Sequence, residues 1–148
     1  MNEYRITKYD PAKRVNGIYT ADDWTSIGDI GKSFSGVILT QEEYQAVESA
    51  HVRCVIEIYK LSNMPRLAVR NPEYHGSGIR LPKKVVDTQV LQKIVVNCLR
   101  QKYWAKLEGK DFYVHFGYDY YLYVGTNLDW PDVNEICKKN HLFCEIFH

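Results

Sequence analysis

Hydrophobic and polar positions alternate with a period of two between residues 112 and 125, which is the clearest pattern in the chain. Such alternation is typical of extended strands, and Gly117, Tyr118 and Asp119 can supply a turn, so a β-hairpin is predicted here. One face of the hairpin would carry apolar side chains, namely Phe112, Val114, Phe116, Tyr120, Leu122 and Val124. The other face would carry large side chains with polar tips, namely Tyr113, His115, Tyr121 and Tyr123. Side chains of this second kind can either pack under a helix or be presented to a partner.

Three stretches have apolar residues at helical spacing and begin at residues that can cap a helix. They run from Thr40 to Asn63, from near Asp87 through Leu99, and from Asn127 or Asp129 onward. Thr40 and Glu43 form a capping box, in which each side chain can satisfy a backbone N–H of the first turn. Pro131 is tolerated because it falls in the first turn of the third helix.

Five further segments have the pattern of strands or short extended pieces. They are Glu3–Tyr9, Leu67–Arg70, Ile79–Leu81, Tyr103–Glu108 and Leu142–Phe147. We expect residues 12–34 to be an ordered loop with a helical turn at Thr20–Trp24, and residues 71–78 to be a flexible loop. Strands that come in a run while the helices are scattered favour an α+β fold over a doubly wound parallel sheet. The prediction is therefore a layer sandwich with a mainly antiparallel sheet and about three helices.

The composition is that of one globular domain, which we expect to span residues 1–148. The formal net charge is only +1, so no global field points to nucleic acid or an anionic membrane as a partner. The amino terminus lacks an apolar signal core, and no apolar run approaches the roughly 20 residues of a spanning helix. We therefore expect a soluble, cytoplasmic protein that does not act at a membrane.

The four cysteines lie far apart in the chain and include no CxxC pair. Without that spacing, neither a zinc site nor a disulfide framework is indicated. We interpret them as small buried hydrophobic residues, namely Cys54, Cys98, Cys137 and Cys144. No metal and no cofactor is expected.

Two histidines are candidates for catalysis. His115 lies among aromatic residues on the predicted hairpin, where a neighbouring tyrosine or carboxylate could tune it as a general base. His75 lies in a glycine-rich loop with Glu73 and Arg80, which could form a ribonuclease-like acid and base pair. A core or interface histidine and an ordinary surface loop explain these positions as well. We therefore expect no enzyme and assign no catalytic residue, and a small nuclease or hydrolase stays an alternative.

The aromatic face of the hairpin could instead stack single-stranded bases, since stacking on tyrosine contributes about 1–3 kcal/mol per base. Such platforms normally interleave cations that hold phosphates, but residues 113–123 contain no lysine or arginine and carry Asp119 in the turn. Lys102, Lys106 and Lys110 lie on the preceding strand and turn. A nucleic-acid-binding module is thus a second alternative, which the hairpin itself disfavours.

Four stretches give the chain a resemblance to known sequences. They are YRITKYDP at Tyr4–Pro11, DDWTSIGDIG at Asp22–Gly31, LTQEEY at Leu39–Tyr44 and VHFGYDYYLYVG at Val114–Gly125. Together they resemble small bacterial immunity proteins of contact-dependent growth inhibition and other polymorphic toxin systems, and the resemblance runs from end to end. The ending HLFCEI at His141–Ile146 departs from the Gly-Leu-Phe and acidic pair that is usual in that group. The resemblance therefore assigns no role to the carboxy terminus.

The resemblance implies a cytoplasmic antitoxin that neutralises a cognate toxin domain, commonly a nuclease, by covering its active site. Such a protein needs a rigid scaffold and a patch of aromatic anchors and carboxylates that meets a basic cleft. Three clusters are candidates for partner binding, namely the acidic loop Asp22, Asp23, Trp24 and Asp29, the turn Tyr118 and Asp119, and the cluster Asp129, Trp130 and Asp132. Asp22 and Asp129 could instead cap helices, and Trp24 could fill the core.

Overall fold

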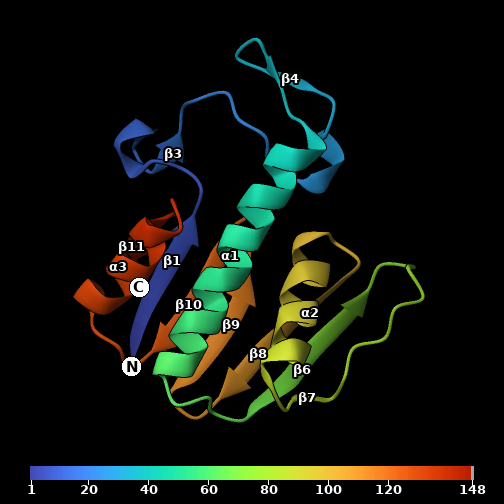
Figure 1. The fold of residues 1–148 in the computed structure, drawn as a ribbon, viewed down its shortest axis with the longest axis vertical. Helices are drawn as coiled ribbons and strands as arrows, with labels where there is room; N and C mark the ends of the chain where they lie inside the picture. Colours follow the sequence, from blue (N-terminus) through green and yellow to red (C-terminus); the bar gives the residue numbers. More distant parts are fainter. Residues whose placement is uncertain (148) are drawn as a thin grey trace.

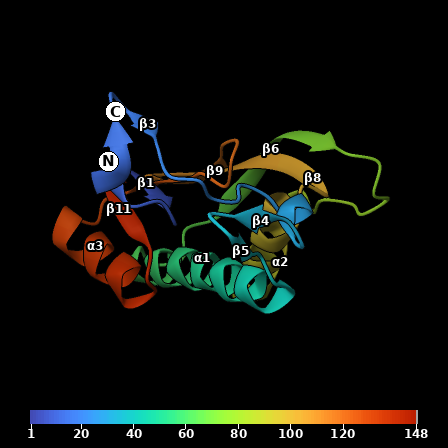
Figure 2. The same ribbon diagram turned by 90° about the horizontal axis from the view of Figure 1, so that it is seen from above.

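Three α-helices lie against one face of a seven-stranded antiparallel sheet, so the computed structural model, which describes residues 1–147, has two layers (Figures 1 and 2). This arrangement confirms the predicted α+β class. The helices are α1 (Gln41–Leu61), α2 (Thr88–Leu99) and α3 (Trp130–Lys139). The strands of the sheet, in spatial order, are β11 (Phe143–Ile146), β1 (Asn2–Thr7), β10 (Leu122–Thr126), β9 (Phe112–Phe116), β8 (Tyr103–Gly109), β6 (Leu67–Tyr74) and β7 (Lys84–Val85).

The predicted hairpin is strands β9 and β10 at the centre of this sheet. Val124 pairs with Val114 and Leu122 with Phe116, so the apolar set shares the face that the helices cover. The side chains of Val114, Leu122 and Val124 are fully buried. The alternation of residues 112–125 therefore forms the centre of the core.

Side-chain caps begin the first two helices where the sequence predicts them. The Thr40 hydroxyl accepts a hydrogen bond from the backbone N–H of Glu43 at 3.1 Å, and the Asp87 carboxylate accepts one from Val90 at 2.8 Å. Helix α3 starts after Asp129 and has Pro131 in its first turn, as expected, but the Asp129 side chain makes no cap hydrogen bond. Of the helices among residues 1–147, none has both the length and the apolar character that a bilayer crossing requires.

Residues 12–34 contain no helical turn at Thr20–Trp24, so that prediction was wrong. Residues 11–38 instead form two small hairpins, β2 (Arg14–Val15) with β3 (Ile18–Tyr19) and β4 (Ser33–Phe34) with β5 (Val37–Ile38), and two short 3₁₀ turns, η1 (Pro11–Lys13) and η2 (Ile27–Asp29). The Asp23 carboxylate accepts from the N–H of Trp24, and the Asp29 carboxylate accepts from Thr25. Such local bonds satisfy backbone donors outside a helix and so compete with helix formation.

The predicted flexible loop 71–78 is also partly wrong, because β6 continues through its first half to Tyr74. The register between β6 and β8 shifts between Arg70 and Glu73, where Asn71 has a left-handed φ of 50°. Beyond this bulge Tyr74 pairs with Tyr103. The expected extended piece at 79–81 forms no strand, and the pairing with β6 lies instead at β7.

All four cysteines are buried, and none of them forms a disulfide within residues 1–147. This confirms their interpretation as small buried residues. Burial raises the pKa of the Cys98 thiol to about 12. Cys54, Cys137 and Cys144 lie together, and the proximity of the other two thiols raises the pKa of Cys137. Cys98 and Cys137 are therefore neutral packing groups at physiological pH.

The second face of the sheet lies away from the three helices (Figure 2). We call it the open face, and it carries the side chains of the hairpin that have polar tips. The Tyr113 ring lies directly over Gly125, where an added Cβ would overlap the ring, and its hydroxyl donates to Glu3 at 2.9 Å. The Tyr123 ring packs on Phe147 with their centroids 4.7 Å apart. Glycine at position 125 thus lets Tyr113 lie flat on the sheet, and only 8% of Tyr113 is exposed.

Replacing Gly125 by alanine should destabilise the protein because its Cβ meets the Tyr113 ring. Overpacking of this kind costs about 1–3 kcal/mol. Gly28→Ala is the matched control, since its Cβ would meet only Ser26 Oγ at 3.5 Å, and it should change stability by less than about 0.5 kcal/mol. Urea denaturation measures both changes. Equal midpoints for the two variants would contradict the packing described for Tyr113.

Candidate functional site

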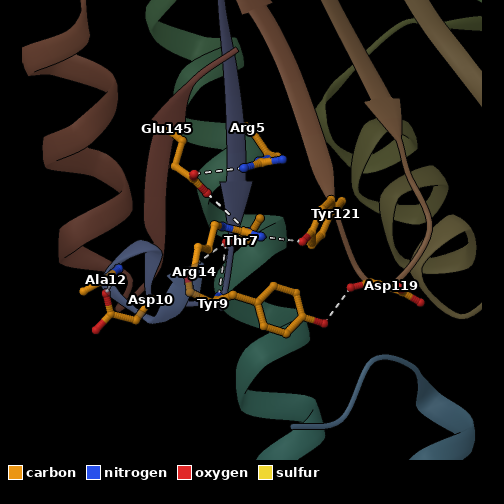
Figure 3. A network of polar contacts seen from close by, with 9 residues as sticks. All are labelled: Arg5, Thr7, Tyr9, Asp10, Ala12, Arg14, Asp119, Tyr121 and Glu145. Carbon is orange, nitrogen blue, oxygen red and sulfur yellow. Dashed lines mark hydrogen bonds and ion pairs between the residues drawn. The ribbon is translucent and has the colours of Figure 1, made fainter. Parts of the chain in front are cut away.

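Two of the three predicted partner-binding clusters come together in space, and Tyr9 joins them. The Tyr9 hydroxyl donates to the backbone oxygen of Asp119 at 2.6 Å (Figure 3) and also lies 3.3 Å from the backbone oxygen of Trp24. Burial raises the pKa of Tyr9, so its hydroxyl stays protonated and can donate. The acidic loop and the turn after β9 are therefore parts of one surface region.

The third cluster lies at the other end of β1, near the start of α3. The Tyr4 hydroxyl donates to the backbone oxygen of Leu128, and the ring of Tyr4 lies 6.2 Å from that of Trp130. Tyr4 lies in the first half of β1 and Tyr9 follows the other end of this strand, so the two regions are separate. Asp129 and its neighbour in the cluster, Asp132, are exposed and Trp130 is half-buried. These three residues therefore lie outside the region that the other two clusters form, and their contact with a partner stays an untested prediction.

The carboxylates of the acidic loop mainly hold the loop itself. Asp22 accepts from the backbone N–H of Ser35 at 2.7 Å, and Asp29 accepts from that of Thr25 at 2.9 Å, which lowers the pKa of Asp29. Trp24 is 7% exposed and lies in the core, as the alternative interpretation of this residue stated. The structural role of these side chains is thus to shape the loop.

Lys8 connects the acidic loop to Tyr9. Its Nζ lies 3.0 Å from an Asp23 carboxylate oxygen, 4.1 Å from the centre of the Trp24 ring and 4.3 Å from that of Tyr9. Only 6% of the Lys8 side chain is exposed, and burial lowers its pKa to about 8 in spite of Asp23. At neutral pH a buried ammonium group therefore sits between two rings and one carboxylate.

A second polar network holds the segment after β1 against the open face. Glu145 accepts from Arg5 at 2.9 Å and forms an ion pair with Arg14 at 3.4 Å (Figure 3). Arg14 also donates to the Tyr121 hydroxyl at 2.8 Å. The Thr7 hydroxyl accepts from the backbone N–H of Tyr9 at 3.1 Å, so the chain turns where Tyr9 leaves β1. These bonds fix the direction in which Tyr9 reaches Asp119.

The turn Gly117–Tyr120, which we call the hairpin tip, has an unusual backbone. Asp119 and Tyr120 have φ values of 59° and 69°. Aspartate tolerates this left-handed region, whereas a bulky residue such as tyrosine rarely adopts it, at a cost of about 1–2 kcal/mol. Tyr118 next to them is 85% exposed.

The burial of the Tyr120 ring offsets that cost. Its centroid lies 5.1 Å from Trp24, 5.9 Å from Tyr44 and 5.0 Å from His51, and its hydroxyl donates to that of Tyr44 at 3.1 Å. His51 donates from Nδ1 to the Val47 carbonyl at 2.8 Å. Burial lowers the pKa of His51 to about 4, so the ring beside Tyr120 is neutral at pH 7.

A cavity of about 310 Å³ opens beside the hairpin tip. The end of β6, the end of α2, β8 and the tip enclose it. Its lining residues are Thr25, Glu73, His75, Cys98, Leu99, Gln101, Trp104, Phe116, Gly117, Tyr118, Asp119 and Tyr120. We refer to it as the tip pocket.

Aromatic and acidic groups face each other in the tip pocket. The rings of Trp104 and Tyr118 stack at an interplanar angle of 26° with their centroids 5.9 Å apart. Glu73 pairs with Trp104 across β6 and β8. His75 donates from Nδ1 to the backbone oxygen of Gln101 at 2.9 Å, so Nε2 of the neutral ring is an acceptor. The structure thus brings together Glu73 and His75, as the ribonuclease-like alternative requires, whereas Arg80 does not line this pocket.

The other candidate histidine, His115, lies on the open face. Its Nε2 is 3.2 Å from a Glu108 carboxylate oxygen, and its ring centroid is 4.2 Å from that of Tyr113. Burial lowers the pKa of His115, and the attraction of Glu108 only partly opposes this. His115 does not line the tip pocket. No group of three or more His, Cys, Asp or Glu side chains within residues 1–147 is arranged to hold a metal ion.

Trp104 and Gln101 are residues of this site that sequence reasoning missed. The period of two in β8 places Trp104 on the face opposite Tyr103, which could have marked it as available to solvent. Its contact with Tyr118 depends on the register of β8 and β9, which the alternation does not determine. Comparison of the chain with models of protein families, with curated proteins and with solved structures finds no match.

Tyr9→Phe should destabilise the protein and loosen the hairpin tip, because it leaves the partly buried backbone oxygen of Asp119 without its donor. Loss of such a partner costs about 1–3 kcal/mol. Tyr19→Phe is the control, since the Tyr19 ring packs 4.8 Å from that of Tyr9 but its hydroxyl makes no hydrogen bond within residues 1–147. Its cost should stay below about 0.5 kcal/mol. Urea denaturation measures the two free energies, and a Tyr9→Phe variant as stable as Tyr19→Phe would refute the anchoring role of this hydroxyl.

Proposed function

We propose that this chain is an immunity protein that binds and neutralises a cognate toxin, a nuclease, in the bacterial cytoplasm, and that the hairpin tip with its pocket is the contact surface. The observation that carries the proposal is the exposure of Tyr118. This large ring is 85% exposed in a turn in which Tyr9 holds the backbone oxygen of Asp119 and the ring of Tyr120 lies in the core. Aromatic side chains on a preorganised surface are the usual anchors of protein interfaces.

The positions of the four stretches that carry the resemblance support the proposal. Each stretch contributes to the cluster below the hairpin tip, with Tyr9 from the first, Trp24 from the second, Tyr44 from the third and Tyr120 from the fourth. The stretches that carry the resemblance to immunity proteins therefore also supply the hairpin tip and the aromatic cluster below it.

The local charge supports a basic partner. Glu73 and Asp119 both line the tip pocket, although the whole chain carries a net charge of only +1. Complementary local charge accelerates association and selects partners even when the whole molecule is nearly neutral. A nuclease presents a basic cleft to its substrate, which is a complementary surface.

A second candidate function is favoured by the placement of Glu73 and His75 in one pocket. In that case the two side chains would act as an acid and base pair in the hydrolysis of a nucleic acid or of another substrate. Cleavage of single-stranded RNA by the purified protein, abolished in His75→Ala, would support this function and count against the first.

Co-expression with the toxin encoded immediately upstream tests the proposed function. Cells that carry the wild-type protein should survive, and Tyr118→Ala should weaken toxin binding at least about tenfold because it removes the anchor. The Asp129→Asn, Asp132→Asn double variant changes the remote cluster and should bind like the wild type.

Cells that die as fast with the wild-type protein as without it would refute the immunity function. If the remote double variant loses protection while Tyr118→Ala keeps it, the contact surface is at the start of α3 instead of the hairpin tip.

A further inference from the structure

We propose that the tip pocket binds the guanidinium group of an arginine side chain. That this arginine belongs to a toxin rests on the proposed function, whereas the preference of the pocket for a guanidinium group rests on its own lining.

The tip pocket offers hydrogen-bond acceptors and negative charge. Glu73 and Asp119 are the acidic residues of its lining, and the neutral form of His75 has Nε2 as an acceptor because Nδ1 donates to Gln101. None of the lining residues, all of which lie in the described part of the chain, is a lysine or an arginine. A guanidinium group has five N–H donors and no acceptor, so it matches this lining, whereas a phosphate or carboxylate ligand would be repelled.

The aromatic wall favours arginine over lysine. Trp104 and Tyr118 present nearly parallel rings, with Tyr118 open to solvent. A planar guanidinium group can stack on such a ring and point its edge donors at carboxylates, which the compact ammonium group of lysine cannot do. The aromatic wall of the pocket thus selects the planar shape of the guanidinium group, and the acidic residues select its charge.

The end of helix α2 adds negative potential. Cys98 and Leu99 are at the carboxyl end of α2 and line the pocket, and this end of a helix carries a partial charge of about −0.5. Arg100 follows directly, but both hydrogen bonds of its guanidinium go to the Glu48 carboxylate at 2.8 Å. Arg100 and Glu48 do not line the tip pocket, so the cation is neutralised outside it.

The size of the pocket fits one side chain. Its volume of about 310 Å³ lies at the small end of the range of ligand sites, which runs from about 300 to 1,000 Å³. A side chain inserted by a partner fills such a space, and the exposed Tyr118 at its rim can contact the surrounding surface of that partner.

An NMR titration of the labelled protein with N-acetyl-L-arginine amide tests the proposal, and N-acetyl-L-citrulline amide is the matched neutral probe. The arginine probe should shift the Trp104 indole N–H and the Gly117 and Tyr118 amide signals, saturating with a millimolar Kd. The citrulline probe should bind at least about tenfold more weakly, since it keeps the shape but lacks the charge.

Variants assign the binding to the pocket. Glu73→Gln with Asp119→Asn removes both charges, and Asn tolerates the left-handed backbone at 119. This double variant and Tyr118→Ala, which changes only an exposed ring, should each weaken arginine binding at least about fivefold. The Asp129→Asn, Asp132→Asn variant should leave the Kd unchanged.

Equal shifts by the two probes would overturn the charge preference, and no shift at Trp104 up to about 50 mM probe would overturn the site itself. The titration contains no toxin, so its outcome is independent of the co-expression experiment. Arginine binding without protection of cells would remove the immunity function and leave the pocket assignment intact. Protection of cells without arginine binding would overturn the pocket assignment and leave the immunity function intact.

Discussion

The packing of the Tyr120 ring is the contact on which the surface of this protein depends. A bulky residue in the left-handed region is strained, and the strain persists only where the surroundings compensate for it. Here Trp24, Tyr44 and His51 enclose the ring, and the Tyr44 hydroxyl accepts from that of Tyr120. These partners come from a loop and a helix that are distant in sequence, so the contact joins the two layers of the fold to the amino-terminal loop.

Burial of Tyr120 also determines what the neighbouring residues can do. With Tyr120 turned inward and the oxygen of Asp119 held by Tyr9, Tyr118 is directed outward beside Trp104. A partner that meets this tip would not need to order it, which reduces the entropic cost of association. The buried Tyr120, which holds the tip in place, and the exposed Tyr118 are thus two consequences of one turn.

The helix-covered half of the molecule could be predicted from sequence because local patterns determine it. The alternation of residues 112–125 identified the central hairpin, and the caps at Thr40 and Asp87 located the starts of two helices. In each case the signal lies within a few residues of the element that it predicts, and burial of the apolar face then favours one arrangement.

The candidate site could be predicted only in part, because long-range contacts build it. The sequence places Tyr118 and Asp119 in a turn but leaves Trp24 open between a contact residue and a core residue, and the structure shows that Trp24 lies in the core. The path of the chain from β1 to α1 depends on side-chain bonds such as those of Asp23 and Asp29, which carry no periodic signal. The tip pocket depends in addition on the bulge in β6, which carries Glu73 to the pairing position opposite Trp104.

Hydrogen–deuterium exchange of the protein with and without its proposed toxin partner tests the central claim most directly, because it reports which surface a partner covers. The claim that the hairpin tip and its pocket form the contact surface predicts slower exchange in the complex at residues 117–119 and 73–75, with little change at the start of α3. Protection confined to α3, or to the open face around His115, with none at the hairpin tip would contradict it.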